Sequence, residues 1–189
     1  KELTELKEKY GDSRRTQIIE FEDGKIETDD LIKDEETAIT ITTSGYIKRL
    51  PLEVYKLQHR GGKGVVATVI KDEELVKDIF VATTHSYILF FTNKGKVYWL
   101  KVYDVPEATR YARGKAIVNL VQLSNDEIVT AFVPVKVFDD THFLVMATKR
   151  GTVKKTELIA YSNPRRNGIV AITLDQGDEL INVEMSDGA

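Results

Sequence analysis

The chain has 189 residues, of which 42% are hydrophobic, which is enough for one or two domains with packed cores. It contains no cysteine, which excludes disulfides and thiolate metal sites and points to a reducing compartment, so we expect a cytoplasmic protein. No apolar run reaches the roughly 20 residues of a membrane helix, and the charged start KELTELKEKYG is unlike a signal peptide.

The formal net charge of −3 averages over two unlike regions. Residues 1–36 carry 13 acidic and 7 basic residues, whereas the rest of the chain carries 17 acidic and 20 basic residues. The excess of positive charge after residue 36 is too small to identify a nucleic-acid-binding protein by itself. The positions of the basic residues must decide that question.

The first 36 residues form a predicted lead-in. Leu3 and Leu6 lie one helical turn apart among strong helix formers, and Gly11 follows them, which predicts a short N-terminal helix. Asp23-Gly24 interrupts an apolar run in the manner of a hairpin turn, so a small strand pair is expected around it. The sequence predicts a boundary near residue 37, between a lead-in of residues 1–36 and a domain of residues 37–189.

The second region repeats. Each copy has an apolar strand, a polar turn ending in glycine, a strand that bears basic residues, and an end that contains tyrosine. These copies occupy residues 38–55, 87–105 and 143–161. Their turn glycines, Gly45, Gly95 and Gly151, are 50 and 56 residues apart.

A glycine-containing half-repeat follows each copy, at residues 62–70, 113–121 and 166–174, with Gly64, Gly114 and Gly168 in equivalent places. Strand repeats of this length are typical of propeller-like blades. The sequence therefore predicts an all-β radial array with blades at about residues 37–86, 87–141 and 142–189.

Three acidic pairs could suggest general acid and base catalysis: Glu73-Glu74, Asp126-Glu127 and Asp178-Glu179. Each pair precedes an apolar strand at the same place in its repeat, which favours a turn over an active site. The three histidines, His59, His85 and His142, lack the spacing of paired metal ligands. Gly62-Lys63-Gly64 also lacks the first glycine and the Ser or Thr of a phosphate-binding P-loop. We therefore expect no catalytic residue and no metal site.

Basic residues recur in the repeats at two places. The first set lies in the turn and in the strand after it: Lys48, Arg49, Lys94, Lys96, Lys101, Lys149, Arg150, Lys154 and Lys155. The second set accompanies the half-repeat glycines: Arg60, Lys63, Arg110, Arg113, Lys115, Arg165 and Arg166. Equivalent positions in a radial array share one edge, so both sets predict a positive rim that can follow a phosphate backbone without reading its sequence. The alternative is that these residues are ordinary solvated side chains.

One half-repeat carries a glycine-rich basic box, QHRGGKG, formed by Gln58, His59, Arg60, Gly61, Gly62, Lys63 and Gly64. This box resembles the one in the family of C-terminal DNA-wrapping domains of DNA gyrase A. The stretches GYIKRLPLEVYKLQHRGGKG, VYDVPEATRYARGKAIVNL and MATKRGTVKKTELIAY resemble successive stretches of that family in the same order. GDSRRTQI is similar to the passage that leaves the breakage-reunion region, so the resemblance covers essentially the whole chain.

The resemblance implies a β-pinwheel, a propeller-like disc whose blades exchange strands and whose basic edge bends duplex DNA. This chain would be the lead-in and about three blades, against five or six in a complete wheel. The catalytic tyrosine would lie upstream of residue 1, and the ATP and Mg²⁺ sites in other regions of the parent enzyme. That enzyme, a type IIA topoisomerase, would contain two copies of gyrase A with two of gyrase B, and would introduce negative supercoils.

The composition of the box suits wrapping. Gly61, Gly62 and Gly64 allow the main chain to approach a phosphate, while Arg60 and Lys63 supply charge. The family usually has a basic residue at the position of His59, so one phosphate contact is predicted to depend on pH, with a packing role as the alternative.

Two further functions remain open, which are the related subunit of topoisomerase IV and a propeller that serves as a protein-interaction scaffold. Because blades at an open end lack partner strands, we also expect strand exchange, dimerisation or fraying around residues 175–189.

Overall fold

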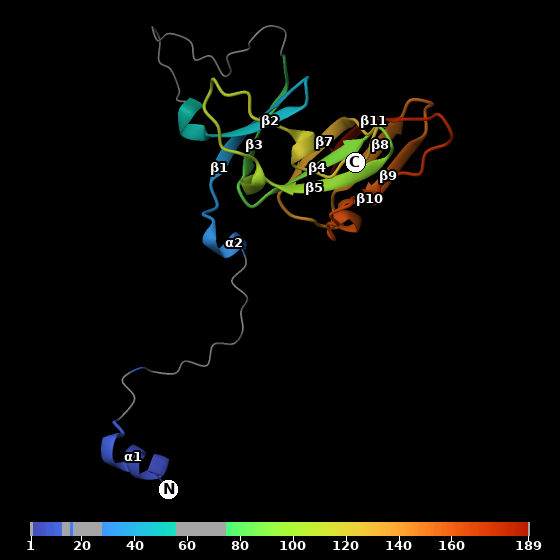
Figure 1. Cartoon of the computed structure of the whole chain (residues 1–189). Helices are drawn as coiled ribbons and strands as arrows, with labels where there is room; N and C mark the ends of the chain where they lie inside the picture. The colour runs from blue at the N-terminus through green and yellow to red at the C-terminus, as the bar shows by residue number, and fades with distance from the viewer. Residues whose placement is uncertain (1, 13–15, 17–27, 56–74, 189) are drawn as a thin grey trace, which may run out of the picture. The chain divides into compact units, whose positions relative to one another are not determined.

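The structure is a computed structural model that describes residues 2–12, 16, 28–55 and 75–188 (Figure 1). The chain divides into two compact units, residues 1–31 and residues 32–189. The predicted hairpin around Asp23-Gly24 lies outside the described residues.

Where the structure describes the first unit, it has two helices, α1 (Glu2–Tyr10) and α2 (Thr28–Leu31). In α1, Glu2 and Glu5 occupy the first turn and Lys7 and Lys9 the last, an order that complements the helix dipole. The amide of Gly11 bonds the carbonyl of Lys7 at 2.8 Å, where the helix ends. The predicted N-terminal helix is confirmed.

The described residues of the second unit form three antiparallel sheets, which confirms the all-β prediction. We call these sheets the first, second and third blades. The first has the order β3-β1-β2-β6, with β3 (Val76–Thr83), β1 (Glu36–Thr42), β2 (Tyr46–Pro51) and β6 (Lys115–Ala116). The second has the order β10-β5-β4-β7, with β10 (Ile169–Val170), β5 (Lys96–Lys101), β4 (Tyr87–Thr92) and β7 (Val129–Val135). The third has the order β11-β8-β9, with β11 (Leu180–Ser186), β8 (Phe143–Thr148) and β9 (Val153–Glu157).

Neighbouring blades exchange strands. The short strand β6 belongs to the second sequence repeat but pairs with β2 of the first blade, where Ile47 faces Lys115. In the same way β10, from the third repeat, pairs with β5 of the second blade, where Val97 faces Ile169. The half-repeats at residues 113–121 and 166–174 therefore each complete the blade that precedes them in the sequence.

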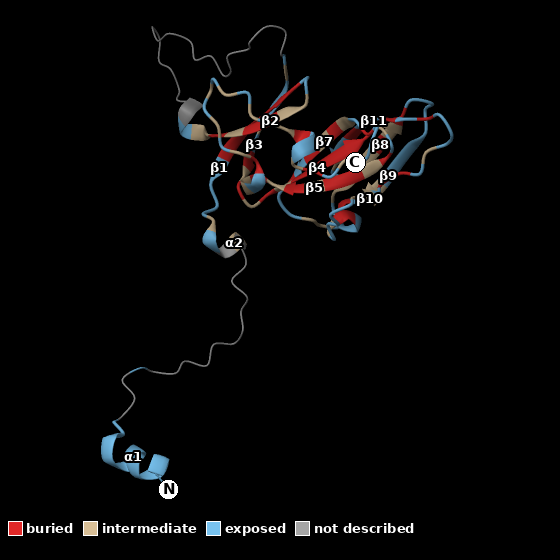
Figure 2. Cartoon of the chain, in the orientation of Figure 1, coloured by how far each residue is buried: buried red, intermediate tan, exposed pale blue. Residues whose placement is uncertain are grey.

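The core lies between the blades, as the buried strands in Figure 2 show. Strand β4 is buried on both sides because its residues alternate between two clusters. Ile88 and Phe90 pack with residues of the first blade, and Leu89 and Phe91 with residues of the third. This double burial explains why the sequence YILFF has no polar position.

Residues 32–35 belong to the second unit, because hydrogen bonds tie them to the turn between β3 and β4. The Thr84 hydroxyl donates to the carbonyl of Lys33 at 2.8 Å, and the Glu35 amide donates to the Thr84 hydroxyl at 3.1 Å. The ring of His85 lies 2.7 Å from the carbonyl oxygen of Ile32. The acidic stretch before β1 is therefore attached to the first blade.

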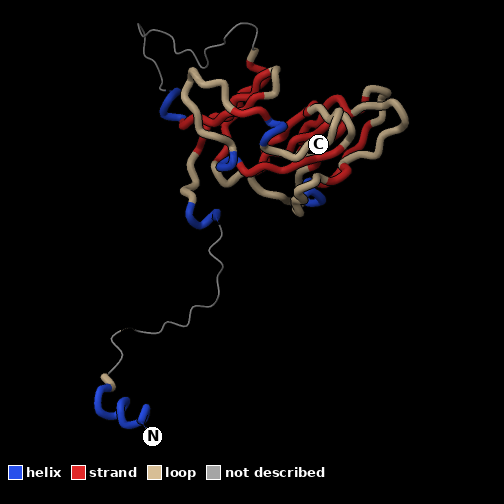
Figure 3. Tube along the Cα trace, viewed as in Figure 1, coloured by secondary structure: helices blue, strands red, loops and turns tan. Residues whose placement is uncertain are grey.

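In the part of the chain that the structure describes, loops and 3₁₀ turns connect the strands (Figure 3). The 3₁₀ turns are η1 (Leu52–Tyr55), η2 (Val102–Asp104), η3 (Ile117–Asn119) and η4 (Leu158–Tyr161). Residues 175–188 include β11, which pairs with β8 from Leu180 to Ser186. Strand exchange, dimerisation or fraying around this segment stays a prediction. Within the described part of the chain, the edge without a fourth strand is that of β9. That is the position filled by β6 and β10 in the other two blades.

Candidate nucleic-acid interface

The hairpin turns of the second and third blades carry exposed basic side chains. Lys94 lies in the β4–β5 turn, and Lys149 and Arg150 lie in the β8–β9 turn. The glycine that closes each turn has a positive φ, 73° at Gly95 and 90° at Gly151, as the tight turn requires. The turn of the first blade has Thr43 and Ser44 instead, so it adds no charge.

The glycine before each exchanged strand packs closely against the preceding blade. Gly114 has a φ of 91°, and a Cβ placed there would lie 2.5 Å from the carbonyl oxygen of Ile47. Gly168 has a φ of 68°, and its Cβ would lie 2.9 Å from the ring of Tyr98. Both positions therefore require glycine for conformation and for space.

Strand exchange brings basic residues of different repeats to one edge. Arg113 and Lys115 are exposed beside β2, and the Arg113 guanidinium lies 3.9 Å from the centroid of the Tyr46 ring. Arg165 and Arg166 are exposed on the half-repeat that leads into β10, which pairs with β5 at Lys96. The edge of each of these two blades thus carries cations from the next repeat.

Lys48 is not on an exposed rim, which corrects the prediction for this residue. Its side chain is buried, with 2% exposure. The ammonium donates to the carbonyls of Arg110 at 2.9 Å and Ala112 at 3.0 Å, in the exchanged segment just before Gly114. Because its ammonium bonds backbone carbonyls, Lys48 fastens the exchanged segment to the first blade.

Three further predicted cations are partly buried, and the side chains of two of them, Arg49 and Lys101, bond neighbouring groups. Arg49 Nε donates to the carbonyl of Val105 at 2.7 Å, and the guanidinium lies 3.4 Å from Glu107. Lys101 Nζ donates to the carbonyl of His85 at 3.0 Å and lies 4.2 Å from the Tyr87 ring centroid. Arg110 is half-buried, and its carbonyl receives the Lys48 bond. The Arg49 and Lys101 side chains therefore fix the loops whose carbonyls they bond.

The basic residues of the third blade are exposed but bonded on one side. Lys154 Nζ donates to the carbonyl of Ala171 at 2.7 Å, and Lys155 Nζ lies 4.3 Å from the Phe143 ring centroid. Arg150 donates to the carbonyl of Gln176 at 2.9 Å, and Lys149 lies 3.5 Å from Glu179. An ammonium or guanidinium has several donors, so each of these groups can still bond a phosphate.

The acidic pairs in the described residues stabilise turns, as predicted. Asp126 has a φ of 65° within its turn. The Asp178 carboxylate accepts the amides of Arg150 at 3.0 Å and Glu179 at 2.9 Å. The Glu73-Glu74 pair lies outside the described residues.

Glu127 is a buried carboxylate that joins the turn to β5. It accepts the Tyr98 hydroxyl and the Ser124 amide, each at 2.7 Å, and lies 3.7 Å from Lys96 Nζ. Burial opposes its charge, but the bonds from Tyr98 and Ser124, with the charge of Lys96, outweigh burial and lower the Glu127 pKa. Burial and the bond to this carboxylate raise the pKa of Tyr98 to about 12. Tyr98 is therefore a neutral donor, and its ring packs against Gly168.

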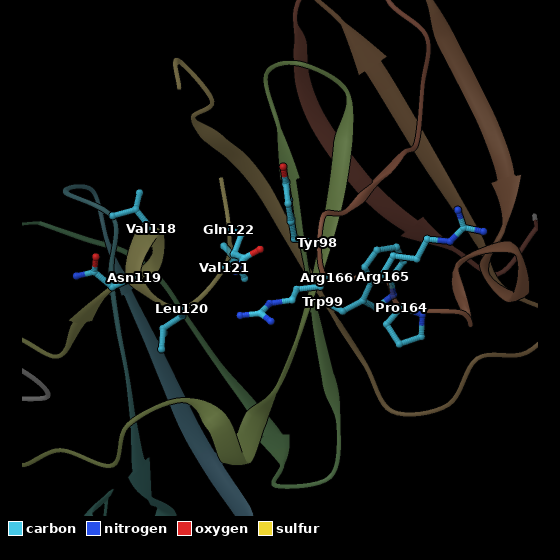
Figure 4. Close-up of a pocket in the computed structure, with 10 residues that line it drawn as sticks. All are labelled: Tyr98, Trp99, Val118, Asn119, Leu120, Val121, Gln122, Pro164, Arg165 and Arg166. Carbon is cyan, nitrogen blue, oxygen red and sulfur yellow. The ribbon is translucent and has the colours of Figure 1, made fainter. Parts of the chain in front are cut away.

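A pocket of about 410 Å³ opens beside these residues (Figure 4). One side is formed by residues 118–122, and the other by Trp99, Pro164, Arg165 and Arg166. With its amide oxygen turned to Arg166, Gln122 accepts from the Nε at 3.0 Å and from the Nη2 at 3.1 Å. Trp99 Nε1 donates to the carbonyl of Tyr161 at 2.8 Å, which fixes the indole ring.

The box of residues 58–64 lies outside the described residues, and with it the predicted roles of Arg60, Lys63 and His59. The other two histidines bond different partners: His85 contacts Ile32, and His142 Nδ1 lies 2.8 Å from Asp139. Among the described residues there is no group of three His, Cys, Asp or Glu side chains that could hold a metal ion. In the same part of the chain, no helix is long and apolar enough to span a membrane.

Sequence reasoning missed Tyr46, Tyr98, Trp99 and Gln122, because it selected residues by positive charge. One signal was available. Lys48, Tyr98 and Lys154 each lie three residues after their turn glycine, and Arg49, Trp99 and Lys155 lie four residues after it. Tyrosine and tryptophan at positions that are basic in the other two repeats marked the second blade as different.

Comparison with known families gives one match that covers three segments. The model of the family described as DNA gyrase C-terminal domain, beta-propeller, matches residues 36–83, 86–136 and 142–187.

Curated relatives match nearly the whole chain. The DNA gyrase A protein of Fibrobacter succinogenes is 49% identical over 97% of this chain and 20% of the relative. That of Clostridium acetobutylicum is 47% identical over 99% of this chain and 22% of the relative. The chain thus spans about a fifth of the length of these relatives.

Two solved structures share the fold. The C-terminal domain of a DNA topoisomerase IV matches with a TM-score of 0.70 and 26% identity over 83% of this chain and 47% of the other. The C-terminal domain of a DNA gyrase A matches with a TM-score of 0.60 and 25% identity over 81% of this chain and 48% of the other.

Proposed function

The chain belongs to the DNA gyrase C-terminal domain family, and from this premise we propose that it binds and wraps duplex DNA along its basic edge without sequence preference. Exposed cations on such an edge neutralise phosphates and release counterions, which gives affinity that depends on salt and not on base sequence.

One observation carries this proposal, namely the convergence of basic residues from different repeats through strand exchange. Lys115 pairs opposite Ile47 of the first blade, and the half-repeat with Arg165 and Arg166 lies against the second. Among the described residues, Lys94, Lys115 and Arg165 have no ion pair or hydrogen bond to occupy their charge. The proposed contact set is Lys94, Lys96, Arg113, Lys115, Lys149, Arg150, Lys154, Lys155, Arg165 and Arg166, together with the box residues Arg60 and Lys63.

Wrapping requires many such contacts. Bending a short duplex through a large angle opposes binding by several kcal/mol on elastic estimates, so contacts distributed along the edge are needed to offset the bend. The box glycines would let the main chain approach a phosphate closely. We therefore expect loss of the box to reduce DNA bending more than simple binding.

In the longer protein, the wrapped DNA would support ATP-dependent negative supercoiling by a type IIA topoisomerase in the cytoplasm. That enzyme would contain two copies of gyrase A with two of gyrase B, and the catalytic tyrosine, ATP and Mg²⁺ would belong to regions other than this chain. Accordingly, the isolated chain is expected to bind DNA without cleaving it and without hydrolysing ATP.

A second candidate is the corresponding subunit of topoisomerase IV, favoured by the TM-score of 0.70 to that domain. The near-complete box QHRGGKG and the 49% identity to a DNA gyrase A favour gyrase. A protein-interaction scaffold is the remaining alternative, and it predicts no dependence of function on the basic residues.

The direct test is binding of a labelled duplex of about 40 base pairs across a salt series, with the chain and an Arg60→Ala/Lys63→Ala variant. We expect affinity to fall steeply as salt rises, and the variant to bind more weakly with a shallower slope. Energy transfer between dyes at the two ends of the duplex would report bending in the same samples. Absence of binding at low salt would contradict the proposal and favour the scaffold.

A further inference from the structure

The pocket beside Trp99 lies where the second blade meets the half-repeat that precedes β10. Its lining residues include two aromatic residues, two amides and two arginines, around a volume of about 410 Å³. Such a lining suits an anion attached to an apolar group, because the guanidinium bonds the charge and the rings contact the apolar part.

The two arginines of the pocket differ in what they bond. Arg166 reaches toward the side formed by residues 118–122, and Arg165 points away from it (Figure 4). Gln122 accepts both the Nε and one Nη2 proton of Arg166 through a single oxygen, at 3.0 and 3.1 Å. A guanidinium has five N–H donors, so three remain for a ligand.

Gln122 leaves the charge of Arg166 uncompensated, because its amide is neutral. A carboxylate at this position would have formed an ion pair and cancelled that charge. The arrangement therefore orients a cation without neutralising it. An oriented arginine loses less conformational freedom when it binds than a mobile one.

Trp99 also lines the pocket, and its indole lies beside Arg165 and Pro164, on the other side from the Arg166 guanidinium (Figure 4). Its indole is held by the bond from Nε1 to the Tyr161 carbonyl at 2.8 Å. Tyr98, the next wall residue, is held by its 2.7 Å bond to Glu127. Both rings are thus fixed before a ligand binds. The Trp99 Nε1 proton and the Tyr98 hydroxyl proton are already donated, to Tyr161 and Glu127.

From these contacts we propose that the pocket is a subsite for one sugar-phosphate unit of the bound duplex, with Arg166, positioned by Gln122, as the phosphate anchor and Trp99 as a nearby reporter of binding. This inference rests on the proposed function. It adds Gln122 as a positioning residue, and it assigns different roles to the adjacent Arg165 and Arg166. Free phosphate has the same charge chemistry, so the test must separate the two sources.

The test uses the fact that Trp99 is the only tryptophan of the chain. Its fluorescence is titrated with a duplex of about 40 base pairs, while the anisotropy of a dye on the duplex reports total binding. Inorganic phosphate alone is titrated in parallel. We expect the duplex to change Trp99 emission with the midpoint seen by anisotropy, and phosphate to produce a smaller change at far higher concentration.

The decisive variant is Gln122→Glu, with Asn119→Asp as a control that adds the same charge on the same wall. If Arg166 anchors a phosphate, a carboxylate at residue 122 pairs with it, and duplex affinity falls roughly tenfold, against about twofold for the control. Arg166→Gln should show a similar loss and a salt slope reduced by about one. If Gln122 only stabilises the loop, Gln122→Glu replaces the amide–guanidinium bond with an ion pair and retains wild-type affinity.

Three results would overturn the assignment. Duplex binding that leaves Trp99 emission unchanged, with Gln122→Glu equal to wild type, removes the pocket from the DNA path and leaves the proposed function intact. A response to phosphate but not to duplex makes free phosphate the ligand. Absence of duplex binding by anisotropy contradicts both the subsite and the proposed function. The melting temperature of each variant must match that of the wild type for these comparisons to hold.

Discussion

The equivalent strands β2 of the first blade and β9 of the third show how one repeat position can have two roles. Lys48 and Lys154 each lie three residues after their turn glycine. Lys48 is buried and bonds the carbonyls of Arg110 and Ala112 in the exchanged segment. Lys154 is exposed on β9, which has no fourth strand among the described residues. The strand from the next repeat, and not the local sequence, therefore decides which lysines are available to a ligand.

Glycine substitutions give the largest effect and separate close packing from backbone strain. Gly114 and Gly151 have nearly equal φ values of 91° and 90°, but only Gly114 would place a Cβ against another strand. Gly151→Ala should lower the free energy of unfolding by about 1 kcal/mol through its positive φ. Gly114→Ala should lower it by about 3–5 kcal/mol, because the Cβ collides with the backbone of Ile47. Equal losses in chemical denaturation would show that β6 is not seated as described.

The lysine comparison can be tested with Lys48→Met and Lys154→Met. Loss of the buried ammonium leaves backbone carbonyls without their donor, so Lys48→Met should destabilise the domain by about 2–4 kcal/mol. Lys154→Met should change stability by less than about 1 kcal/mol but reduce the salt slope of DNA binding. Hydrogen exchange at the Ile117 amide, which bonds Gly45, would locate the first effect. If Lys48→Met instead reduced the salt slope of DNA binding and left stability unchanged, Lys48 would be an exposed DNA contact and the comparison would be wrong.

The second blade sharpens the comparison, because it supports its exchanged glycine with Tyr98 and Glu127 in place of a lysine. Glu127→Gln should destabilise the domain by about 1–3 kcal/mol near pH 7. The Glu127 pKa is lowered from 4.5, so its stabilisation is present above about pH 4.5 and is lost as pH falls through the lowered value. The gap between wild type and variant in urea denaturation should therefore shrink from pH 7 to pH 3. A constant gap would mean that the charge of Glu127 has no part in stability.

The smallest stability effect is expected in the turn of the third blade. Lys149 and Glu179 form an ion pair at 3.5 Å, with side chains 66% and 50% exposed. Solvent screens such pairs, so Lys149→Ala should change the free energy of unfolding by less than about 0.5 kcal/mol. DNA affinity should still fall, because the proposed role of Lys149 is to contact phosphate. A variant with wild-type affinity would remove Lys149 from the contact set.

The repeat pattern predicted the fold well because turn glycines and apolar strands impose it locally. Gly95 and Gly151 have the positive φ that their turns require, and β4 is as buried as its sequence YILFF indicates. Strand exchange between particular blades could not be read from the sequence, because β6 and β10 are two-residue strands defined by a partner more than 60 residues away.

The candidate site was predicted less completely than the fold. The basic residues were found from their charge, but the exposure of each depends on tertiary contacts. Lys48 was predicted to be exposed and is buried. Arg49 and Lys101 were predicted to be on the rim, and their side chains bond loop carbonyls. Charge also gave no reason to select Trp99 or Gln122, which line the pocket beside Arg166. The roles assigned to Trp99 and Gln122 depend on which groups they contact, and those contacts are visible only in the structure.

The most direct test of the central claim is the salt slope of duplex binding for a variant that loses two exposed edge cations, Lys115→Ala/Arg165→Ala. The matched control is Lys7→Ala/Lys9→Ala, which removes the same charge from exposed positions of α1. If the basic edge contacts phosphates, the slope of log K against log salt should decrease by about two for the edge variant and stay unchanged for the control. Equal slopes for the wild type and both variants would contradict a DNA-binding edge.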